Sequence, residues 1–301
     1  MLRKIYNTVR EQGVVGAMHA ARRIVAPARA RCLGLCRQLV QGGAGLEIGG
    51  PSGVFGARGV LPLYADVASL DNCNFASQTT WEGTIREGRT YRFAKDKEPG
   101  TQYVAETTDL GRIASGSYDF LLSSHVLEHS ANALRALSEW IRVIKDDGVL
   151  VLLIPHKDGT FDHRRPVTTL EHLIDDFESG VKEDDLTHLE EILHLHDLKR
   201  DPEAGSPEAF RRRSQANLEN RCLHHHVFDM RLVARLLDHL GLQILAIEAM
   251  RPNHIVAVAR KPGGGRHADN GSMLADLPRH QLLSPFPSDR ASASLPSPAR
   301  S

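Results

Sequence analysis

Cysteine is scarce in this sequence, with four residues among 301, and their scattered positions lack the paired spacing of a structural zinc site. A disulfide framework is therefore not expected, and a reducing cytoplasm is the predicted location. No apolar run is long enough to span a membrane, and the N-terminus lacks the apolar core of a signal peptide. Because 37 basic and 37 acidic side chains balance, we expect no general attraction to nucleic acid.

The composition is that of a globular protein with one sizeable domain. Hydrophobic residues make up 41% of the chain and charged residues 25%. The sequence divides into a basic segment over residues 1–40, a central domain over 41–261, and a final segment over 262–301. Gly, Ser, Pro, Ala and Arg dominate that final segment, which cannot bury a core, so we predict a disordered tail.

The basic segment has apolar residues at roughly helical spacing, at Ile5, Val9, Val14 and Met18. This spacing predicts an amphipathic helix. Two interpretations fit it. The helix packs beside the domain with its arginines in solvent, or it makes a peripheral contact with an anionic membrane surface.

In the central domain, short apolar runs alternate with helical patterns. The expected strands are 45–48, 103–106, 118–123, 149–154, 243–248 and 254–259. The expected helices are 131–144, which Gly148 would end in a left-handed conformation, and 229–240. The alternation predicts an α/β fold, with a doubly wound, mostly parallel sheet. The last two strands are joined by a short turn, so they should form an antiparallel hairpin at the sheet edge.

A charged, histidine-rich stretch over residues 156–223 interrupts this alternation. It contains helical patterns at 169–177 and 186–195. Because the stretch follows the carboxyl end of a strand, we expect it over the crevice where open α/β sheets bind ligands. We predict a helical lid that binds the second substrate.

The stretch GLEIGGPSGVF, residues 45–55, predicts the strand-to-loop corner of a nucleotide-binding unit. Its glycines let the backbone approach a ligand closely, and Glu47 near the strand end can accept hydrogen bonds. Pro51, within this loop, offers no backbone N–H and has a fixed φ, so one backbone contact to a ligand is expected to be missing or moved.

Three segments resemble the class I S-adenosylmethionine-dependent methyltransferases, and the resemblance covers residues 45–261. They are GLEIGGPSG, SYDFLLSSHVLEH at residues 117–129, and KDDG before an apolar strand. The resemblance implies a Rossmann-like sheet of seven strands, S-adenosylmethionine as cofactor, and methyl transfer. More narrowly, EIGGPS, SSHVLEH and TFDHRRP are similar to type-11-like bacterial methyltransferase-domain proteins associated with glycan biosynthesis.

The resemblance also implies the cofactor-binding residues, which are Glu47, Gly49, Gly50, Gly53, Asp71, Glu106, Asp109, Ser124 and His125. Glu47 would anchor the loop and the methionine amino group. Asp71 is the best match for the acid that holds both ribose hydroxyls, with Glu82 as its rival, because a carboxylate can accept two hydrogen bonds. Glu106 would receive the adenine amino group, and Ser124 with His125 would line the sulfonium.

The segment after strand 149–154 offers groups for the methyl acceptor. His156 or His163 could remove a proton, oriented by Asp158 or Asp162. The neighbouring Arg164 and Arg165 could hold an anionic acceptor such as a phosphate-linked sugar. The alternative is that Asp162 and the two arginines form an ion-pair brace for the lid.

Further histidines raise the question of a metal. The candidates are His188, His194, His196, Asp197 and the run 224–226. Histidines two residues apart do not share a helix face, and no compact metal motif is present, so no metal is predicted. Glu128 and His129 are predicted to be structural.

The sequence therefore predicts a cytoplasmic S-adenosylmethionine-dependent methyltransferase that O-methylates a sugar, a glycan precursor or another small polar acceptor. Two alternatives stay open. One is a methyltransferase-like binding or scaffold protein without catalysis. The other is a nicotinamide-binding oxidoreductase, which is disfavoured because the loop is not G-x-G-x-x-G.

Overall fold

A computed structural model describes residues 28–79 and 82–293 of the chain. The predicted amphipathic helix lies almost wholly outside this range. Within it, helix α2 (Leu33–Val40) follows a short segment in which Arg31 pairs with Glu248 at 2.9 Å. Among the described residues, no helix combines the length and apolar character that crossing a membrane requires.

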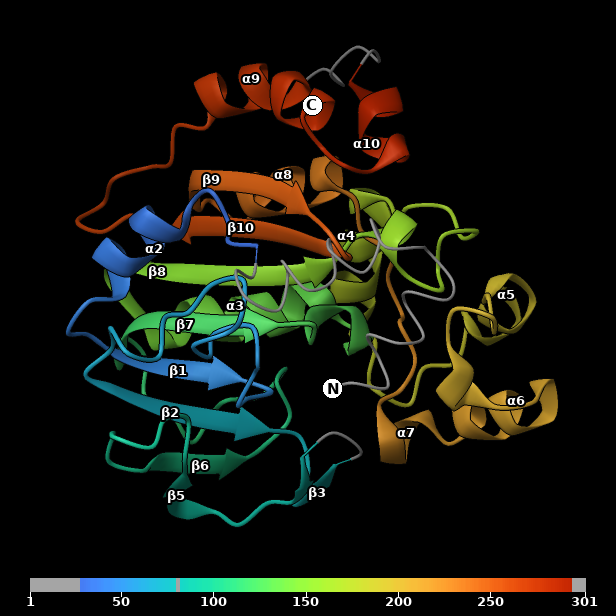
Figure 1. Ribbon diagram of the computed structural model, residues 1–301, viewed down its shortest axis with the longest axis horizontal. Helices are drawn as coiled ribbons and strands as arrows, with labels where there is room; N and C mark the ends of the chain where they lie inside the picture. The colour runs from blue at the N-terminus through green and yellow to red at the C-terminus, as the bar shows by residue number, and fades with distance from the viewer. Residues whose placement is uncertain (1–27, 80–81, 294–301) are drawn as a thin grey trace, which may run out of the picture.

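The core of the protein is a sheet of eight strands in the order β5-β6-β2-β1-β7-β8-β10-β9 (Figure 1). Five neighbouring strands, β6 to β8 in this order, run parallel, whereas β5 and β10 are antiparallel to their neighbours. The strands are β1 Ala44–Ile48, β2 Ser69–Asn74, β5 Gly88–Tyr91, β6 Gly100–Val104, β7 Tyr118–Ser124, β8 Ile144–Pro155, β9 Gln243–Met250 and β10 His254–Arg260. The predicted fold class and the terminal hairpin are confirmed, with β5 as an additional edge strand.

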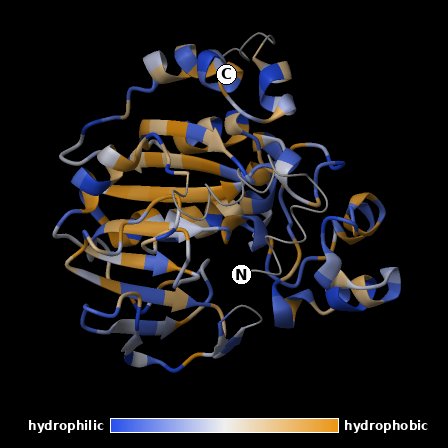
Figure 2. Ribbon diagram, viewed as in Figure 1, coloured by the Kyte–Doolittle hydropathy of each residue, from blue (hydrophilic) through white to orange (hydrophobic). Residues whose placement is uncertain are grey.

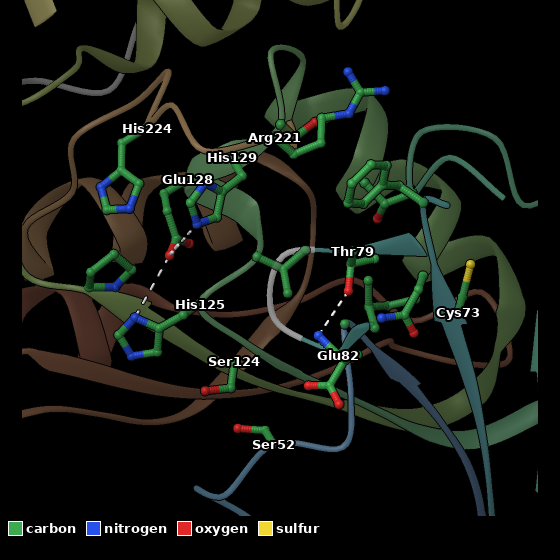
Figure 3. A pocket seen from close by; sticks show the side chains of 18 of the residues that line it. Ser52, Cys73, Thr79, Glu82, Ser124, His125, Glu128, His129, Arg221 and His224 are labelled. Carbon is green, nitrogen blue, oxygen red and sulfur yellow. Dashed lines mark hydrogen bonds and ion pairs between the residues drawn. The ribbon is translucent and has the colours of Figure 1, made fainter. Parts of the chain in front are cut away.

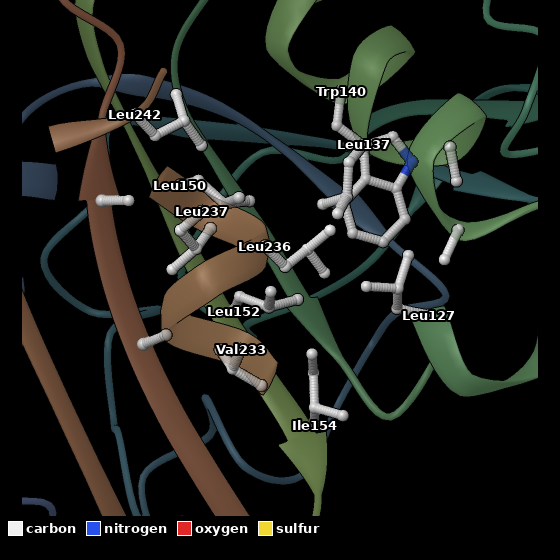
Figure 4. Packing of buried hydrophobic residues seen from close by; sticks show 14 of the residues in the cluster. Leu127, Leu137, Trp140, Leu150, Leu152, Ile154, Val233, Leu236, Leu237 and Leu242 are labelled. Carbon is white, nitrogen blue, oxygen red and sulfur yellow. The ribbon is translucent and has the colours of Figure 1, made fainter. Parts of the chain in front are cut away.

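Helices α3 (Ala133–Val143), α4 (Leu170–Ser179) and α8 (Met230–His239) cover one face of the sheet. Figure 4 shows Leu137 and Trp140 of α3 and Leu236 of α8 packed against Leu150 and Leu152 of β8. The other face is covered by α2 and by the irregular segment 54–67, which buries Phe55, Leu61 and Leu63. Strand β10 and the buried parts of β7 and β8 are accordingly rich in apolar residues (Figure 2).

Gly148 does not end α3 in a left-handed conformation, and that prediction is wrong. Asp147 is the residue with positive φ, at 64°, and Gly148 already lies within β8. A Cβ at Gly148 would lie 2.6 Å from the carbonyl oxygen of Asp119, so this glycine is needed for a close approach of two strands.

The predicted lid, residues 156–223, divides into two parts. Helix α4 belongs to the main core, where Leu170 and Leu173 are buried against the sheet layer. Helices α5 (Leu189–Leu195), α6 (Pro207–Gln215) and α7 (Asn217–Asn220) form a separate lobe beside the carboxyl ends of the strands (Figure 1). This lobe has its own small apolar cluster around Ile192 and Phe210. That the lobe acts as a lid stays a prediction.

The segment after residue 261 is folded as far as residue 293, which corrects the prediction of a disordered tail. Helices α9 (Gly271–Leu282) and α10 (Pro287–Ser292) lie along β9 and α8 (Figure 1). Phe286 is buried and its ring stacks on His156 with centroids 4.1 Å apart. The amino-acid composition of this segment gave the wrong prediction, because a few buried residues such as Phe286 are enough to hold the segment against the core.

We predict that Phe286→Ala lowers the free energy of unfolding by about 3 kcal/mol, because it leaves a cavity under α10. Urea denaturation of the purified protein measures this loss. Leu283→Ala is the matched control, since Leu283 is 68% exposed and its truncation should change stability by less than about 0.5 kcal/mol. Equal effects of the two substitutions would show that the segment does not pack as described.

Candidate active site

A cavity of about 580 Å³ opens at the carboxyl ends of the parallel strands. It is lined by the loop after β1, by residues 73–75 at the end of β2, by 105–107 after β6, by 124–130 after β7, and by residues of the lobe and its connections (Figure 3). In parallel sheets this edge collects the loops that bind ligands. The cavity therefore lies where the sequence predicts the ligand site, at the carboxyl ends of the strands.

The loop after β1 is shaped by Glu47, which is completely buried behind it. The Glu47 carboxylate accepts hydrogen bonds from the Ser52 N–H at 3.0 Å and from the hydroxyls of Tyr64 and Tyr91, at 2.9 and 2.5 Å. Burial raises the pKa of Glu47 to about 7, although these three donors oppose the shift. Glu47 therefore anchors the loop as predicted, while its place behind the loop gives no support to a direct contact with the methionine amino group.

Two of the three predicted glycines line the cavity and one supports the loop from behind. Gly49 and Gly53 line it together with Pro51 and Ser52. Gly50 packs on Glu47, where a Cβ would overlap the carboxyl group, and its N–H donates to Asn72 Oδ1 at 2.9 Å. Gly49 has φ of 77°, which glycine adopts without strain.

Asp71 does not line the cavity, which corrects its assignment to the ribose hydroxyls. Its carboxylate instead accepts from the Thr101 N–H at 2.6 Å and from the Tyr118 hydroxyl at 2.9 Å. β2 continues for three residues beyond Asp71, so the residue at its carboxyl end is Asn74. The rival candidate Glu82 does line the cavity, and its backbone N–H donates to the Thr79 hydroxyl (Figure 3).

Of the two acids predicted to lie near the adenine, only Glu106 lines the cavity. Glu106 lines the cavity and forms an ion pair with Arg221, which comes from the end of the lobe. The Arg221 guanidinium also lies 5.2 Å from the ring centroid of Phe75. Asp109 lies outside the cavity, where its carboxylate accepts from the Gly111 N–H.

Ser124 and His125 line the cavity as predicted. His125 adopts a φ of 56°, and its Nε2 lies 2.8 Å from Nδ1 of His254 at the start of β10. Burial, followed by the neighbouring His254 and His224, lowers the pKa of His125 to about 3. The ring is therefore neutral at physiological pH.

Glu128, His129 and His224 form a cluster in the cavity that the sequence did not reveal (Figure 3). Glu128 is 1% exposed, and neither carboxylate oxygen has a hydrogen-bond partner among the described residues. Its Oε1 lies 3.7 Å from both His125 Nδ1 and His129 Nε2. Burial raises the pKa of Glu128 to about 7. A buried carboxylate left without a donor is costly unless a ligand or cation completes its surroundings.

In both histidines of the cluster, Nδ1 forms a hydrogen bond that fixes the ring. His224 Nδ1 lies 2.5 Å from Asp162 Oδ2, and His129 Nδ1 lies 3.0 Å from the Leu223 carbonyl oxygen. Burial disfavours protonation of His224, but the Asp162 charge and hydrogen bond outweigh it and raise the pKa of His224. One ligand atom from each of Glu128, His129 and His224 lies within 4.8 Å of the others, so the three can hold a metal ion.

His156 is not a catalytic base, and its prediction is wrong. The side chain is fully buried between β8 and the C-terminal segment, with Nε2 3.2 Å from Asp289 and Nδ1 accepting from the Asp158 N–H. His163 does not line the cavity either, because its Nε2 lies 2.9 Å from Asp197. The prediction that Asp162 orients one of these two histidines is wrong, because its partner is His224, 62 residues further along the chain.

Arg164 and Arg165 are not placed for substrate binding, which corrects that assignment. Arg165 is 2% exposed and donates to Glu191, to Asp162 and to the carbonyls of residues 224 and 225. Arg164 pairs with Asp197 at 3.3 Å. Arg165 thus forms the ion pair with Asp162 that the alternative proposed, whereas Arg164 pairs with Asp197 instead. Arg200, which the sequence did not single out, is the arginine of this region that lines the cavity.

Part of the sequence matches a known protein family. A family model described as a methyltransferase domain matches residues 83–152, from the short strand β4 (Gly83–Thr84) into β8. A search among curated proteins gives no match.

Three solved structures illustrate what the fold is similar to. An S-adenosylmethionine-dependent methyltransferase from Mesorhizobium loti is 13% identical, with a TM-score of 0.43 over 76% of this chain and 95% of that one. One from Methanosarcina mazei is 15% identical, with a TM-score of 0.42 over 76% and 97%. The 1,6-didemethyltoxoflavin-N1-methyltransferase of Burkholderia thailandensis, solved with S-adenosylhomocysteine, is 12% identical, with a TM-score of 0.40 over 85% and 89%. Neighbours this distant do not identify a substrate.

We predict that Gly50→Ala disrupts the loop after β1, because the added methyl group overlaps the Glu47 carboxyl group. Titration calorimetry should show at least about tenfold weaker binding of S-adenosylhomocysteine, equivalent to about 1.4 kcal/mol. Gly56→Ala is the control, since Gly56 lies outside the cavity and a Cβ there would make only an ordinary contact, 3.5 Å from the Gly53 carbonyl oxygen. Equal affinities of the Gly50→Ala variant and the unchanged protein would contradict this role of Gly50.

Glu47 should also give the protein a pH-dependent stability. Its pKa of about 7 in the folded state exceeds the ordinary value of 4.5, so the folded state holds the extra proton between these values. Stability should therefore fall as pH rises from 5 to 7 and level off above, by up to about 3 kcal/mol. Thermal unfolding of the protein and of Glu47→Gln, compared at each pH, measures the difference. Parallel profiles would rule out the shift.

Proposed function

We propose that this chain is a class I S-adenosylmethionine-dependent methyltransferase and that it O-methylates a sugar or another small polar acceptor, whose hydroxyl binds beside Glu128. S-adenosylmethionine is the cofactor, and it would supply an already electrophilic methyl group. What the chain itself must do is bind the cofactor, align the acceptor oxygen with the methyl group and help that oxygen lose its proton.

The cofactor half of the cavity is the half nearest β1, β2 and β6. The loop at 49–53 offers backbone to the methionine portion, Glu82 offers a carboxylate to the ribose, and residues 105–107 with Phe75 frame the base. Ser124 and His125 lie at the end of β7, between this half and the Glu128 cluster. The cavity therefore has room for cofactor and acceptor in one continuous space.

One observation carries the assignment of the acceptor half, namely the buried Glu128 carboxylate without a hydrogen-bond partner. Beside it, the Nδ1 atoms of His224 and His129 are fixed by Asp162 and by the Leu223 carbonyl. Acceptors that hold Nδ1 are the usual arrangement around histidines that bind metal through Nε2. We propose that Glu128, His129 and His224 hold a divalent cation, which lowers the pKa of a bound hydroxyl.

The rest of the acceptor half mixes polar and apolar groups. Thr160, Asn253 and the cationic Arg200 line it together with Pro155 and Phe161. The Arg200 guanidinium donates to the carbonyls of residues 158 and 160, which fixes it at the cavity wall. This composition suits a hydroxyl-rich acceptor and is compatible with an attached phosphate.

The decisive substitution is Glu128→Gln, which keeps the shape of the side chain and removes its charge. We expect methyl transfer from labelled S-adenosylmethionine to a panel of sugars and other hydroxyl compounds to fall about 100-fold or more. S-adenosylhomocysteine should still bind by titration calorimetry, because Glu128 lies outside the cofactor half.

His163→Gln is the control, since His163 was a candidate base and lies outside the cavity. It should retain nearly full activity. Full turnover by Glu128→Gln, or turnover by the unchanged protein that a chelator does not reduce, would refute the proposed acceptor chemistry while leaving the cofactor assignment intact.

A further inference from the structure

A second group of ligand-type side chains lies outside the cavity, where α4, the start of α5 and the segment before α8 meet. His172 and Asp176 are one turn apart on α4, so they share a face of that helix. His188 immediately precedes α5, and His226 lies between α7 and α8. His172, His188 and His226 each place one ligand atom within 4.8 Å of the other two.

The distances within this group match a tetrahedral metal site. Four donors about 2.1 Å from a common centre lie about 3.4 Å from one another. His172 Nε2 is 3.0 Å from His188 Nε2 and 3.3 Å from Asp176 Oδ2. His226 donates Nε2–H to the Ala131 carbonyl oxygen at 3.2 Å, so its Nδ1 is the nitrogen free to bind a cation. The rings stand at steep angles to each other, with His172 and His188 at 73°. Such angles between the rings are expected when side chains from three segments approach a common point.

Two buried polar atoms of the group have no hydrogen-bond partner among the described residues. They are Asp176 Oδ2 and His226 Nδ1, and the His226 side chain is 1% exposed. A fully buried imidazole and a carboxylate oxygen are costly to leave unsatisfied. A cation between the four side chains would satisfy the carboxylate and supply the charge that the group lacks.

We propose that His172, Asp176, His188 and His226 form a structural site for a divalent cation of the zinc type. Three imidazoles and one carboxylate suit such a cation, and four protein donors leave no open position for catalysis. The site joins three segments that are distant in sequence. It fixes the lobe of α5–α7 to α4, and so fixes Arg200, Arg221 and His224 in the wall of the cavity.

The test uses the full-length protein, stripped with a chelator and titrated with Zn²⁺. With both cation sites present, about two equivalents should bind, and thermal unfolding should shift to higher temperature. His188→Gln and Asp176→Asn should each bind one equivalent fewer and lose most of that shift. Bound Co²⁺ should show the absorption of a tetrahedral complex, and this signal should disappear in both variants.

Two further variants separate this site from the cluster in the cavity. His194→Gln, on the exposed side of α5, should behave as the unchanged protein does. Glu128→Gln should keep the thermal shift while losing the other equivalent. If the cation site in the cavity does not exist, the unchanged protein binds one equivalent, which His188→Gln still abolishes. Unchanged Zn²⁺ binding and thermal shift in both His188→Gln and Asp176→Asn would overturn the proposal.

Discussion

The buried carboxylate of Glu47 is the constraint on which the cofactor side of the structure depends. A carboxylate removed from water needs donors, and here they come from the Ser52 N–H and from two tyrosine hydroxyls. Tyr64 belongs to the segment that covers one face of the sheet, and Tyr91 ends the edge strand β5. The loop, the covering segment and the sheet edge are thereby held in one arrangement around a single side chain.

Much of the fold could be predicted because its signals are local. The apolar runs at 118–123 and 149–154 indicate strands without any knowledge of the strands beside them. The short turn at 251–253 leaves no room for a crossover helix, so it indicates a hairpin. The same holds for site residues at strand ends. Gly49, Glu106, Ser124 and His125 line the cavity because parallel strands bring their carboxyl ends to one edge.

Residues whose roles depend on distant partners could not be predicted in the same way. Asp71 was separated from the end of β2 by three residues, which strand propensity alone does not resolve. His156 appeared to border the site, but Phe286 and Asp289, 130 or more residues later, enclose it. Asp162 was expected to orient His156 or His163, but its partner is His224. No spacing rule connects Asp162 to His224, which follows the last helix of the lobe in the sequence.

Arg165 has two roles, because the ion pairs that hold the lobe in place also position a histidine of the proposed active site. Its guanidinium is buried, and it bonds both to Asp162 and to the carbonyl of His224, the two residues that also bond to each other. The Asp162 charge is thus balanced by Arg165, and the backbone that carries His224 is fixed by the same group. A buried ion pair contributes little net stability, since desolvation offsets most of its attraction. What Arg165 does provide is a defined position for the His224 ring, on which the proposed acceptor half of the cavity depends.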